Sequence, residues 1–111
     1  MEQPINTIIY QLKSLLDDVL LLKGRTKYWR NNTKLFGNIP ELDAMTAINV
    51  ILAIENKLGV FIDYYEYNAN NFATVESLAI FIYKKNFELN YLISGFGINR
   101  KLYEKMFNFF N

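Results

Sequence analysis

The sequence contains no cysteine and no histidine among its 111 residues, and only two prolines. Without cysteine, the chain cannot form disulfides, thiolate zinc sites or thiol nucleophiles. Without histidine, it lacks the commonest general base and the most frequent transition-metal ligand. Both absences argue against ordinary hydrolytic or metal-dependent catalysis.

An excess of one charge and long apolar runs are also missing. Twelve basic and eleven acidic residues leave a formal net charge of +1, whereas nucleic-acid-binding domains usually carry a clear basic excess. No segment approaches the roughly 18 consecutive apolar residues of a membrane helix, and the first residues do not resemble a signal peptide. We therefore expect a cytoplasmic protein with no membrane span and no nucleic-acid partner.

Hydrophobic residues make up 51% of the chain, enough for a folded core. The first helix is predicted to begin at Pro4 and to stop at Gly24, because apolar residues recur between them every three or four positions. These are Ile5, Ile8, Ile9, Leu12, Leu15, Leu16, Val19 and Leu22.

Residues 23–43 show no periodicity and are predicted to form a long loop. Basic residues precede the first acid of this loop, Glu41, and Tyr28 and Trp29 lie among them. Two interpretations are open: a solvated loop with one aromatic anchor on the core, or a basic-aromatic patch that contacts an anionic partner. The basic residues are Lys23, Arg25, Lys27, Arg30 and Lys34.

A second helix is predicted between Asp43, a favoured N-cap, and Gly59, a typical helix-ending residue. One apolar stripe, expected to pack on the first helix, contains Val50, Ile51, Ile54 and Leu58. A second stripe contains Met45, Ile48 and Leu52. An exposed second stripe is typical of a binding face, unless the long loop or the C-terminal residues cover it.

The remaining elements complete an all-α prediction. We expect one helical turn at residues 68–72, and then a helix that is capped by Thr74 and ends near Lys84 and Lys85. Residues 86–111 contain seven aromatic residues and are expected to form a helical extension, with a hinge or turn at residues 95–97. Its last helix carries Ile98, Leu102, Met106, Phe109 and Phe110. The extension either docks on the bundle or contacts a partner or second copy.

No catalytic group of residues can be assembled from the sequence, so we do not expect an enzyme or a metal site. Asp17 and Asp18 are adjacent on a helix and do not face each other, which predicts a solvated acidic face. Glu41 and Asp43 flank a helix start, where the helix dipole stabilises negative charge.

Residues 35–45 resemble the attachment segment of acyl carrier proteins. They read Leu-Phe-Gly-Asn-Ile-Pro-Glu-Leu-Asp-Ala-Met. In that family Asp-Ser-Leu or Asp-Ser-Met begins the second helix. Further similarities are Ala-Ile-Glu at 53–55, Gly59, Ile-Asp at 62–63 and Phe-Ala-Thr-Val-Glu-Ser-Leu at 72–78. The resemblance covers roughly residues 5–85. It implies that residues 1–85 form an acyl-carrier-like four-helix bundle, in which the third helix along the chain is short and the other three are the main helices. The extension in residues 86–111 follows this domain.

The resemblance also implies a function in fatty acid or secondary metabolite biosynthesis. A phosphopantetheinyl transferase attaches 4′-phosphopantetheine to the serine of an acyl carrier protein. The thiol of that group then holds acyl or aminoacyl thioesters for loading and transferring enzymes. Position 44, flanked by Asp43 and Met45, corresponds to the serine, and free N–H groups of the helix start favour a phosphodiester there. The implied partner-binding residues are Leu42, Met45, Ile48, Asn49 and Leu52.

The chain departs from the family at this position, because residue 44 is alanine. Ala44 has no hydroxyl group, so the chain as given cannot carry a thioester. Either the serine was replaced by engineering, or the natural protein is a pseudo-carrier that acts as a non-catalytic interaction module. We favour engineering, because the residues around Ala44 keep the family pattern. The family often has acids where Asn49, Asn56 and Lys57 occur, so recognition is expected to depend more on apolar contact than on charge.

Overall fold

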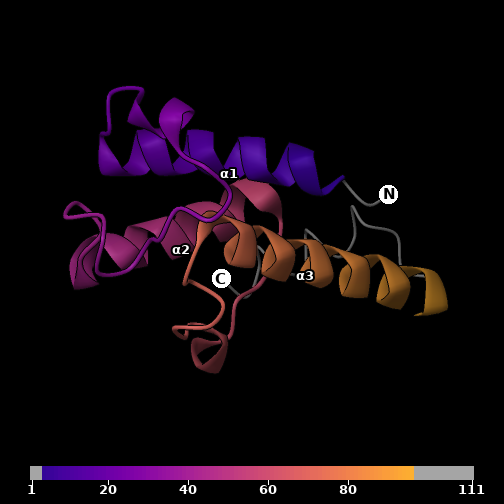
Figure 1. Cartoon of the computed structure of the whole chain (residues 1–111). Helices are drawn as coiled ribbons and strands as arrows, with labels where there is room; N and C mark the ends of the chain where they lie inside the picture. The colour runs from indigo at the N-terminus through magenta and orange to yellow at the C-terminus, as the bar shows by residue number, and fades with distance from the viewer. Residues whose placement is uncertain (1–3, 97–111) are drawn as a thin grey trace.

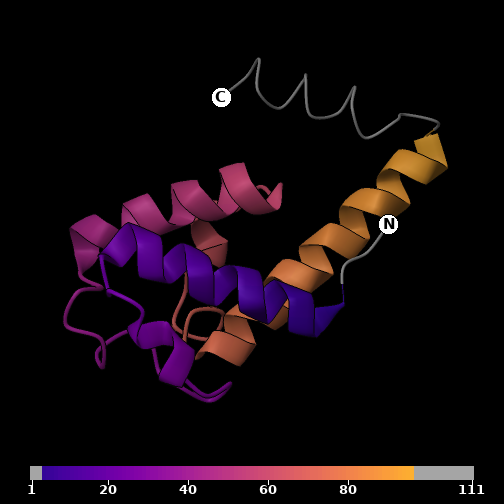
Figure 2. The same ribbon diagram turned by 90° about the horizontal axis from the view of Figure 1, so that it is seen from above.

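The computed structural model describes residues 4–96, and the side chains of residues 4–88. This part of the chain forms α1 (Ile5–Leu20), η1 (Arg25–Tyr28), α2 (Ala44–Leu58), η2 (Tyr64–Glu66) and α3 (Val75–Phe96), where η denotes a 3-10 turn. Helix α1 packs against both α2 and α3 (Figure 1). Seen from above, α1 lies between η1 and α2 (Figure 2). The all-α prediction is confirmed.

Helix α1 ends at Leu20, before the predicted stop at Gly24. Leu21 adopts the left-handed conformation, with φ at 54°, and its N–H donates to the carbonyl of Asp17. Lys23 and Gly24 follow with φ of 56° and 85°, so the chain reverses sharply into η1. Left-handed backbone costs a non-glycine residue about 1–2 kcal/mol, so other contacts must hold this turn.

The carboxylate of Asp17 supplies those contacts. It accepts the Gly24 N–H at 2.9 Å, and it accepts the N–H and hydroxyl of Thr26 at 3.2 and 2.9 Å. The hydrogen bond from Gly24 is the main reason that the pKa of Asp17 lies below its usual value. The predicted solvated acidic face is therefore wrong for Asp17, which organises the turn, whereas Asp18 is exposed.

The long loop between α1 and α2 is fixed to the start of α3. The Leu35 N–H donates to the carbonyl of Ala73 at 2.9 Å, and the Val75 N–H donates to the carbonyl of Thr33 at 3.1 Å. The second bond satisfies one of the N–H groups that a helix start leaves without an intrahelical partner. Two aromatic residues of this loop, Trp29 and Phe36, pack on the core, one more than the single anchor of the solvated-loop interpretation.

Helix α3 begins as predicted but is longer. The Ser77 N–H donates to the Thr74 hydroxyl at 3.0 Å, and the Thr74 N–H donates to the Ser77 hydroxyl at 2.9 Å. The prediction that the helix ends near Lys84 and Lys85 is wrong, because α3 continues without a break to Phe96. Lys85 instead pairs with Glu66 of η2 at 2.9 and 3.1 Å. The predicted division into residues 1–85 and 86–111 therefore falls inside a helix.

The predicted hinge and final helix have different outcomes. Gly95 and Phe96 lie within α3 rather than in a hinge. Gly97 and the predicted final helix lie outside the described residues.

The predicted helical turn at residues 68–72 is present, and an unpredicted 3-10 turn, η2, precedes it. Residues 68–72 form a turn with one helical hydrogen bond, from the Phe72 N–H to the carbonyl of Asn68 at 3.1 Å. The 3-10 turn is η2, where the Asp63 N–H donates to Glu66 Oε1 at 3.0 Å. An Asp-x-x-Glu pattern at 63–66 was the local signal for this turn.

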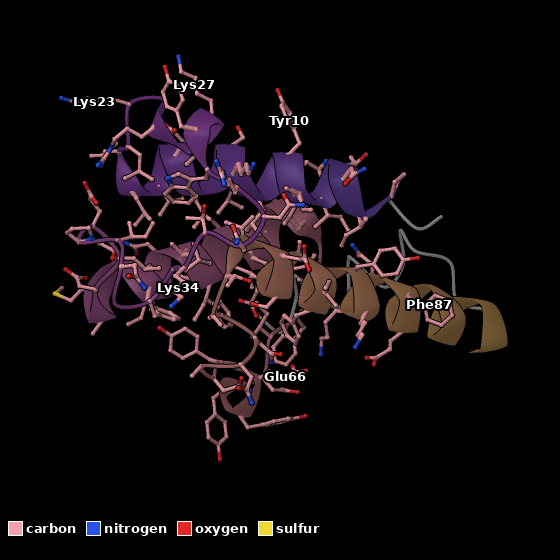
Figure 3. All side chains as sticks on the ribbon, viewed as in Figure 1. Tyr10, Lys23, Lys27, Lys34, Glu66 and Phe87 are labelled. Carbon is pink, nitrogen blue, oxygen red and sulfur yellow. The ribbon has the colours of Figure 1, made fainter. Side chains whose placement is uncertain are left out.

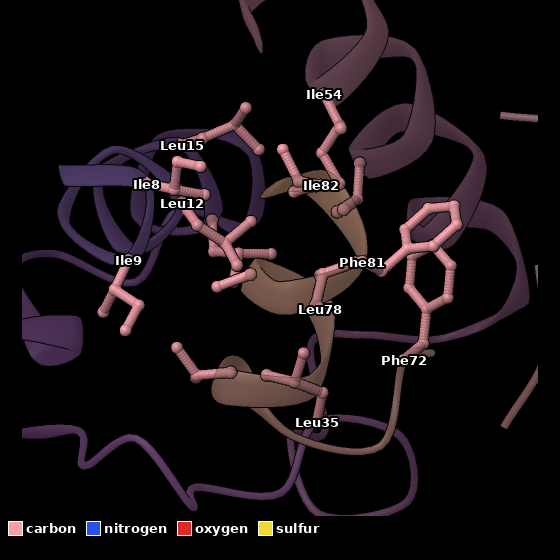
Figure 4. Packing of buried hydrophobic residues seen from close by; sticks show 14 of the residues in the cluster. Ile8, Ile9, Leu12, Leu15, Leu35, Ile54, Phe72, Leu78, Phe81 and Ile82 are labelled. Atoms are coloured by element: carbon pink, nitrogen blue, oxygen red, sulfur yellow. The ribbon is translucent and has the colours of Figure 1, made fainter. Parts of the chain in front are cut away.

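The core lies where the three helices meet, and the long loop contributes Leu35 to it (Figure 4). Phe72 lies beside Phe81 of α3, with ring centroids 6.4 Å apart. Other fully buried side chains are Ile8, Leu12, Leu16, Leu22, Ile54, Val75, Leu78 and Ile82. This core holds the start of α2 against α1 and the loop, and thereby positions the site described next.

Candidate functional site

Position 44 is the first residue of α2 and is exposed to solvent. The preceding residue, Asp43, caps the helix: its Oδ1 accepts the N–H groups of Met45 and Thr46 at 3.0 and 2.9 Å. In return, the Asp43 N–H donates to the Thr46 hydroxyl at 2.9 Å. These hydrogen bonds form a capping box, which fixes the direction in which residue 44 projects.

The capping box changes one expectation about this site. The N–H groups at the helix start were expected to be free for a phosphodiester, but the Asp43 carboxylate already accepts those of Met45 and Thr46. The Thr46 N–H is the largest cause of the lowered pKa of Asp43, so this carboxylate stays ionised at neutral pH. An anion beside residue 44 would therefore meet a negative charge as well as the helix dipole.

An ion pair joins the long loop to the start of α2. The Arg25 guanidinium contacts Glu41 Oε2, and the Arg25 Nε donates to the carbonyl of Leu22 at 3.1 Å. The hydrogen bond from Arg25 is the main reason that the pKa of Glu41 is lowered. The Glu41 carbonyl accepts the Thr46 hydroxyl at 2.7 Å, which links this ion pair to the capping box.

The second apolar stripe of α2 is exposed. Met45 is 80% exposed, Ile48 is 60% exposed and Leu52 is 50% exposed. Asn49 is also exposed. The long loop does not cover these residues, so the stripe begins beside position 44 and follows the outer side of α2.

Leu42 differs from the other predicted partner-binding residues, because it is only 7% exposed and belongs to the core. It immediately precedes the N-cap Asp43, and Ala47 lies four positions into the helix; both Leu42 and Ala47 are buried. Apolar residues at these two positions commonly pack together at a helix start. We therefore exclude Leu42 from the surface that a partner could contact.

The basic residues of the long loop do not act as one group. Arg25 pairs with Glu41, whereas Lys23, Arg30 and Lys34 are exposed. Lys27 lies over the exposed ring of Tyr28, with its Nζ 5.1 Å from the ring centroid. The described residues contain no group of three acidic side chains that could hold a metal ion. None of the helices in residues 4–96 is long and apolar enough to span a membrane.

Comparison with solved structures places this geometry among carrier proteins. The chain is similar to the holo acyl carrier protein of Nitrosomonas europaea, whose structure was determined in solution by NMR. The two are 39% identical, the match covers 69% of this chain and 93% of that chain, and the TM-score is 0.65. No protein-family model matches the chain, and a search of curated proteins gave no match.

The chain belongs to the acyl carrier protein family, since the likeness extends over nearly the whole length of that carrier. The family resemblance and the acyl-carrier-like helical fold predicted from the sequence are confirmed. Members of this family are carriers rather than catalysts, and the prediction that the chain is not an enzyme is confirmed by this membership.

Sequence reasoning missed two contributors to the site. Arg25 was counted among the basic residues of the loop, for which a solvated loop and a basic-aromatic patch were both open, but it fixes the loop to Glu41. No role was predicted for Thr46, but its hydroxyl completes the capping box and contacts the Glu41 carbonyl. An Asp-x-x-Thr pattern at a helix start was the available signal for Thr46. Nothing local indicates the ion pair, because its partners are sixteen residues apart.

Proposed function

We propose that the protein is an acyl carrier whose attachment position is residue 44, and that the chain as given is an unloadable form of it. The observation that supports this proposal is the placement of Ala44. It is exposed, it follows an intact Asp43 cap, and it adjoins the exposed stripe that begins with Met45. These surroundings support a loading position that lacks only a hydroxyl group.

The side chain present at position 44 does not fit a phosphopantetheine group as a covalent ligand. A phosphodiester needs a hydroxyl oxygen, and alanine supplies only a methyl group. The described neighbours do not supply one either, because the Thr46 hydroxyl donates to the Glu41 carbonyl and accepts the Asp43 N–H. For the form with serine, 4′-phosphopantetheine is the expected prosthetic group, and acyl or aminoacyl thioesters are the proposed cargo.

Restoring the hydroxyl tests the proposal. We expect Ala44→Ser to fold normally, because exposed substitutions usually change stability by less than about 0.5 kcal/mol. The variant would be incubated with coenzyme A and a phosphopantetheinyl transferase of broad specificity, and intact mass would be measured. We expect the mass of one phosphopantetheinyl group to be added.

Two controls show whether the position matters. The unchanged chain already contains Ser14, Ser77 and Ser94, and it should gain no mass. Thr46→Ser places a serine two residues further along the same helix start and should also gain none. A folded Ala44→Ser protein that never gains mass would contradict the proposal.

The alternative is a natural pseudo-carrier that binds partners without modification. The exposed stripe formed by Met45, Ile48 and Leu52 favours it, because this surface is present in the unloadable chain. Codon 44 of the natural gene separates the two explanations: an alanine codon supports the pseudo-carrier, and a serine codon supports an engineered change.

The remaining features of the proposal concern the partners. We propose a phosphopantetheinyl transferase and loading or transferring enzymes, which would contact the stripe and Asn49, in fatty acid or secondary metabolite biosynthesis. Residues 86–111 are proposed as an extension that makes a homodimer, docks on the bundle or contacts an enzyme. The cytoplasmic location and the absence of a nucleic-acid partner stay predictions.

A further inference from the structure

The end of α1 and the start of α2 lie at the same end of the molecule (Figure 1). Side-chain contacts connect these two helix ends through η1. Asp17 of α1 holds the turn that carries Arg25, and Arg25 contacts Glu41. Glu41 in turn contacts Thr46 of α2. Position 44 lies between the last two residues of this series, so its orientation is coupled to residues of α1 and η1.

The turn that carries Arg25 is fixed on both sides of this residue. Asp17 Oδ1 accepts the Gly24 N–H at 2.9 Å, and Oδ2 accepts the N–H and hydroxyl of Thr26 at 3.2 and 2.9 Å. Arg25 itself donates from Nε to the Leu22 carbonyl at 3.1 Å. A guanidinium that is already held by one hydrogen bond loses less conformational entropy when its terminal nitrogen meets a carboxylate.

Arg25 is directed differently from the two lysines of this turn. Lys23 and Lys27 are exposed, and both point away from the bundle (Figure 3). The Arg25 guanidinium instead contacts Oε2 of Glu41, which lies sixteen positions further along the chain. Arg25 therefore connects this turn to the segment that leads into α2.

Glu41 depends on Arg25 for the position of its side chain. Its second carboxylate oxygen, Oε1, is buried and accepts no hydrogen bond from another residue of the described chain. The hydrogen bond from Arg25 is the main cause of the lowered pKa of Glu41, so the carboxylate is charged at neutral pH. Burial of a charged oxygen is unfavourable once its cation is removed. Without Arg25, we expect the Glu41 side chain to turn toward water.

A movement of Glu41 would reach position 44 through two short hydrogen bonds. The Glu41 carbonyl accepts the Thr46 hydroxyl at 2.7 Å, and this hydroxyl accepts the Asp43 N–H at 2.9 Å. Residue 44 follows Asp43 directly. The direction in which its side chain leaves the helix therefore depends on both bonds.

We propose that Arg25 is a positioning residue for the loading of position 44, an inference that rests on the proposed function. In loading, a hydroxyl oxygen at position 44 attacks the pyrophosphate of coenzyme A. A phosphodiester bond forms, adenosine 3′,5′-bisphosphate leaves, and the hydroxyl proton passes to a base of the transferase. Arg25 acts on this step by fixing Glu41, and thereby the orientation of the hydroxyl. A nucleophile that is held in its reactive orientation reacts faster than a misaligned one.

This role is separable from a contribution to stability or to partner binding. Arg25 is 56% exposed at its side chain, and exposed ion pairs contribute little to the stability of a fold. The exposed stripe of α2 keeps Met45, Ile48 and Leu52 when Arg25 is replaced. The loss of Arg25 should therefore lower kcat for loading and leave KM and Tm nearly unchanged.

Loading kinetics in the Ala44→Ser background test the inference. We expect Arg25→Gln to lower kcat about fivefold, less than the ~100-fold cost of a 1 Å misplacement, because Asp43 still caps α2. Arg25→Lys should recover part of the rate, since it keeps the charge but not the hydrogen bond to Leu22. The matched control is Arg30→Gln, which makes the same charge change at an exposed residue of the same loop and should leave kcat unchanged.

Amide hydrogen exchange of the chain with Ala44 gives a second readout that needs no loading. Arg25→Gln should raise the exchange rates of the Met45 and Thr46 N–H groups about threefold, and Arg30→Gln should not. Unchanged exchange in Arg25→Gln would overturn the inference. An equal kcat in the two variants would also overturn it.

Two other outcomes separate the inference from its alternatives. A higher KM with an unchanged kcat in Arg25→Gln would overturn the positioning role, because it would assign Arg25 to direct contact with the transferase. Normal loading of Ala44→Ser with no effect of Arg25→Gln would contradict the inference and leave the proposed function intact. An Ala44→Ser protein that is never loaded would contradict both.

Discussion

Ile48 and Ile54 are the same residue type in the same helix, but the structure gives them opposite environments. Ile54 is fully buried, whereas Ile48 is 60% exposed. Replacing a buried isoleucine by alanine costs about 2–5 kcal/mol, because it removes apolar contact and leaves a cavity. Ile54→Ala should therefore lower the free energy of unfolding by at least about 2 kcal/mol, and lower the Tm by about 8 °C or more.

The expected cost for Ile48→Ala is much smaller. Full burial of an isoleucine contributes about 1.5–3 kcal/mol, and about two fifths of that is roughly 0.6–1.2 kcal/mol. Alanine recovers a few tenths of a kcal/mol because it is the better helix former. We expect a net loss of about 0.5 kcal/mol and a change in Tm of less than about 4 °C.

Urea unfolding followed by circular dichroism would measure both variants, with Asn49→Ala as an exposed control on the same helix. If Ile48→Ala destabilises the protein as much as Ile54→Ala, the stripe is covered in solution and the reasoning is refuted. If the stripe is free, Ile48→Ala in the Ala44→Ser background should slow loading by the transferase without unfolding the carrier.

Three further predictions concern contacts around the site. Asp17→Asn should lower the Tm at neutral pH. The folded-state pKa of Asp17 is depressed, so the stabilising contribution of its carboxylate is lost as pH falls through that pKa. Thermal melts across pH should therefore show a smaller Tm difference between the variant and the unchanged chain in acid than at neutral pH. Lys85→Met should lower the free energy of unfolding in urea by on the order of 2 kcal/mol, because it leaves the mostly buried Glu66 carboxylate without its cation. An unchanged free energy of unfolding would contradict a structural role for the pair. Asp43→Ala, in the Ala44→Ser background, should slow the gain of mass because the start of α2 loses its cap; an unchanged rate would show that the cap does not position residue 44.

The helix boundaries that could be predicted are those with local chemical signals. Asp43 and Gly59 delimit α2 because a side-chain cap and a left-handed glycine act within one turn of the chain. The second stripe of α2 was also predictable, since helical spacing separates it from the buried face. Its exposure was not, because the long loop or the C-terminal residues could have covered it. The length of α3 was not predictable in this way. Lys85 has the character of a helix-ending residue, and only its ion pair with Glu66 gives it another role.

The parts of the site that escaped prediction depend on contacts between distant segments. Asp17 and Asp18 are indistinguishable in the sequence, and only the left-handed turn after α1 brings Gly24 to one of them. Leu42 was assigned to the surface with its neighbours, although its position before the N-cap turns it inward. Arg25 could pair with Glu41 only after the loop had folded back toward α2.

The uninterrupted course of α3 has a consequence for how the carrier would be joined to anything else. At 1.5 Å per residue, its 22 residues measure about 33 Å, and its far end projects beyond α1 and α2 (Figure 2). A domain or label attached at Phe96 would start from a rigid rod rather than from a flexible tether. Its separation from position 44 would be set by helix geometry, so a pair of probes at these two points would report a single narrow distance.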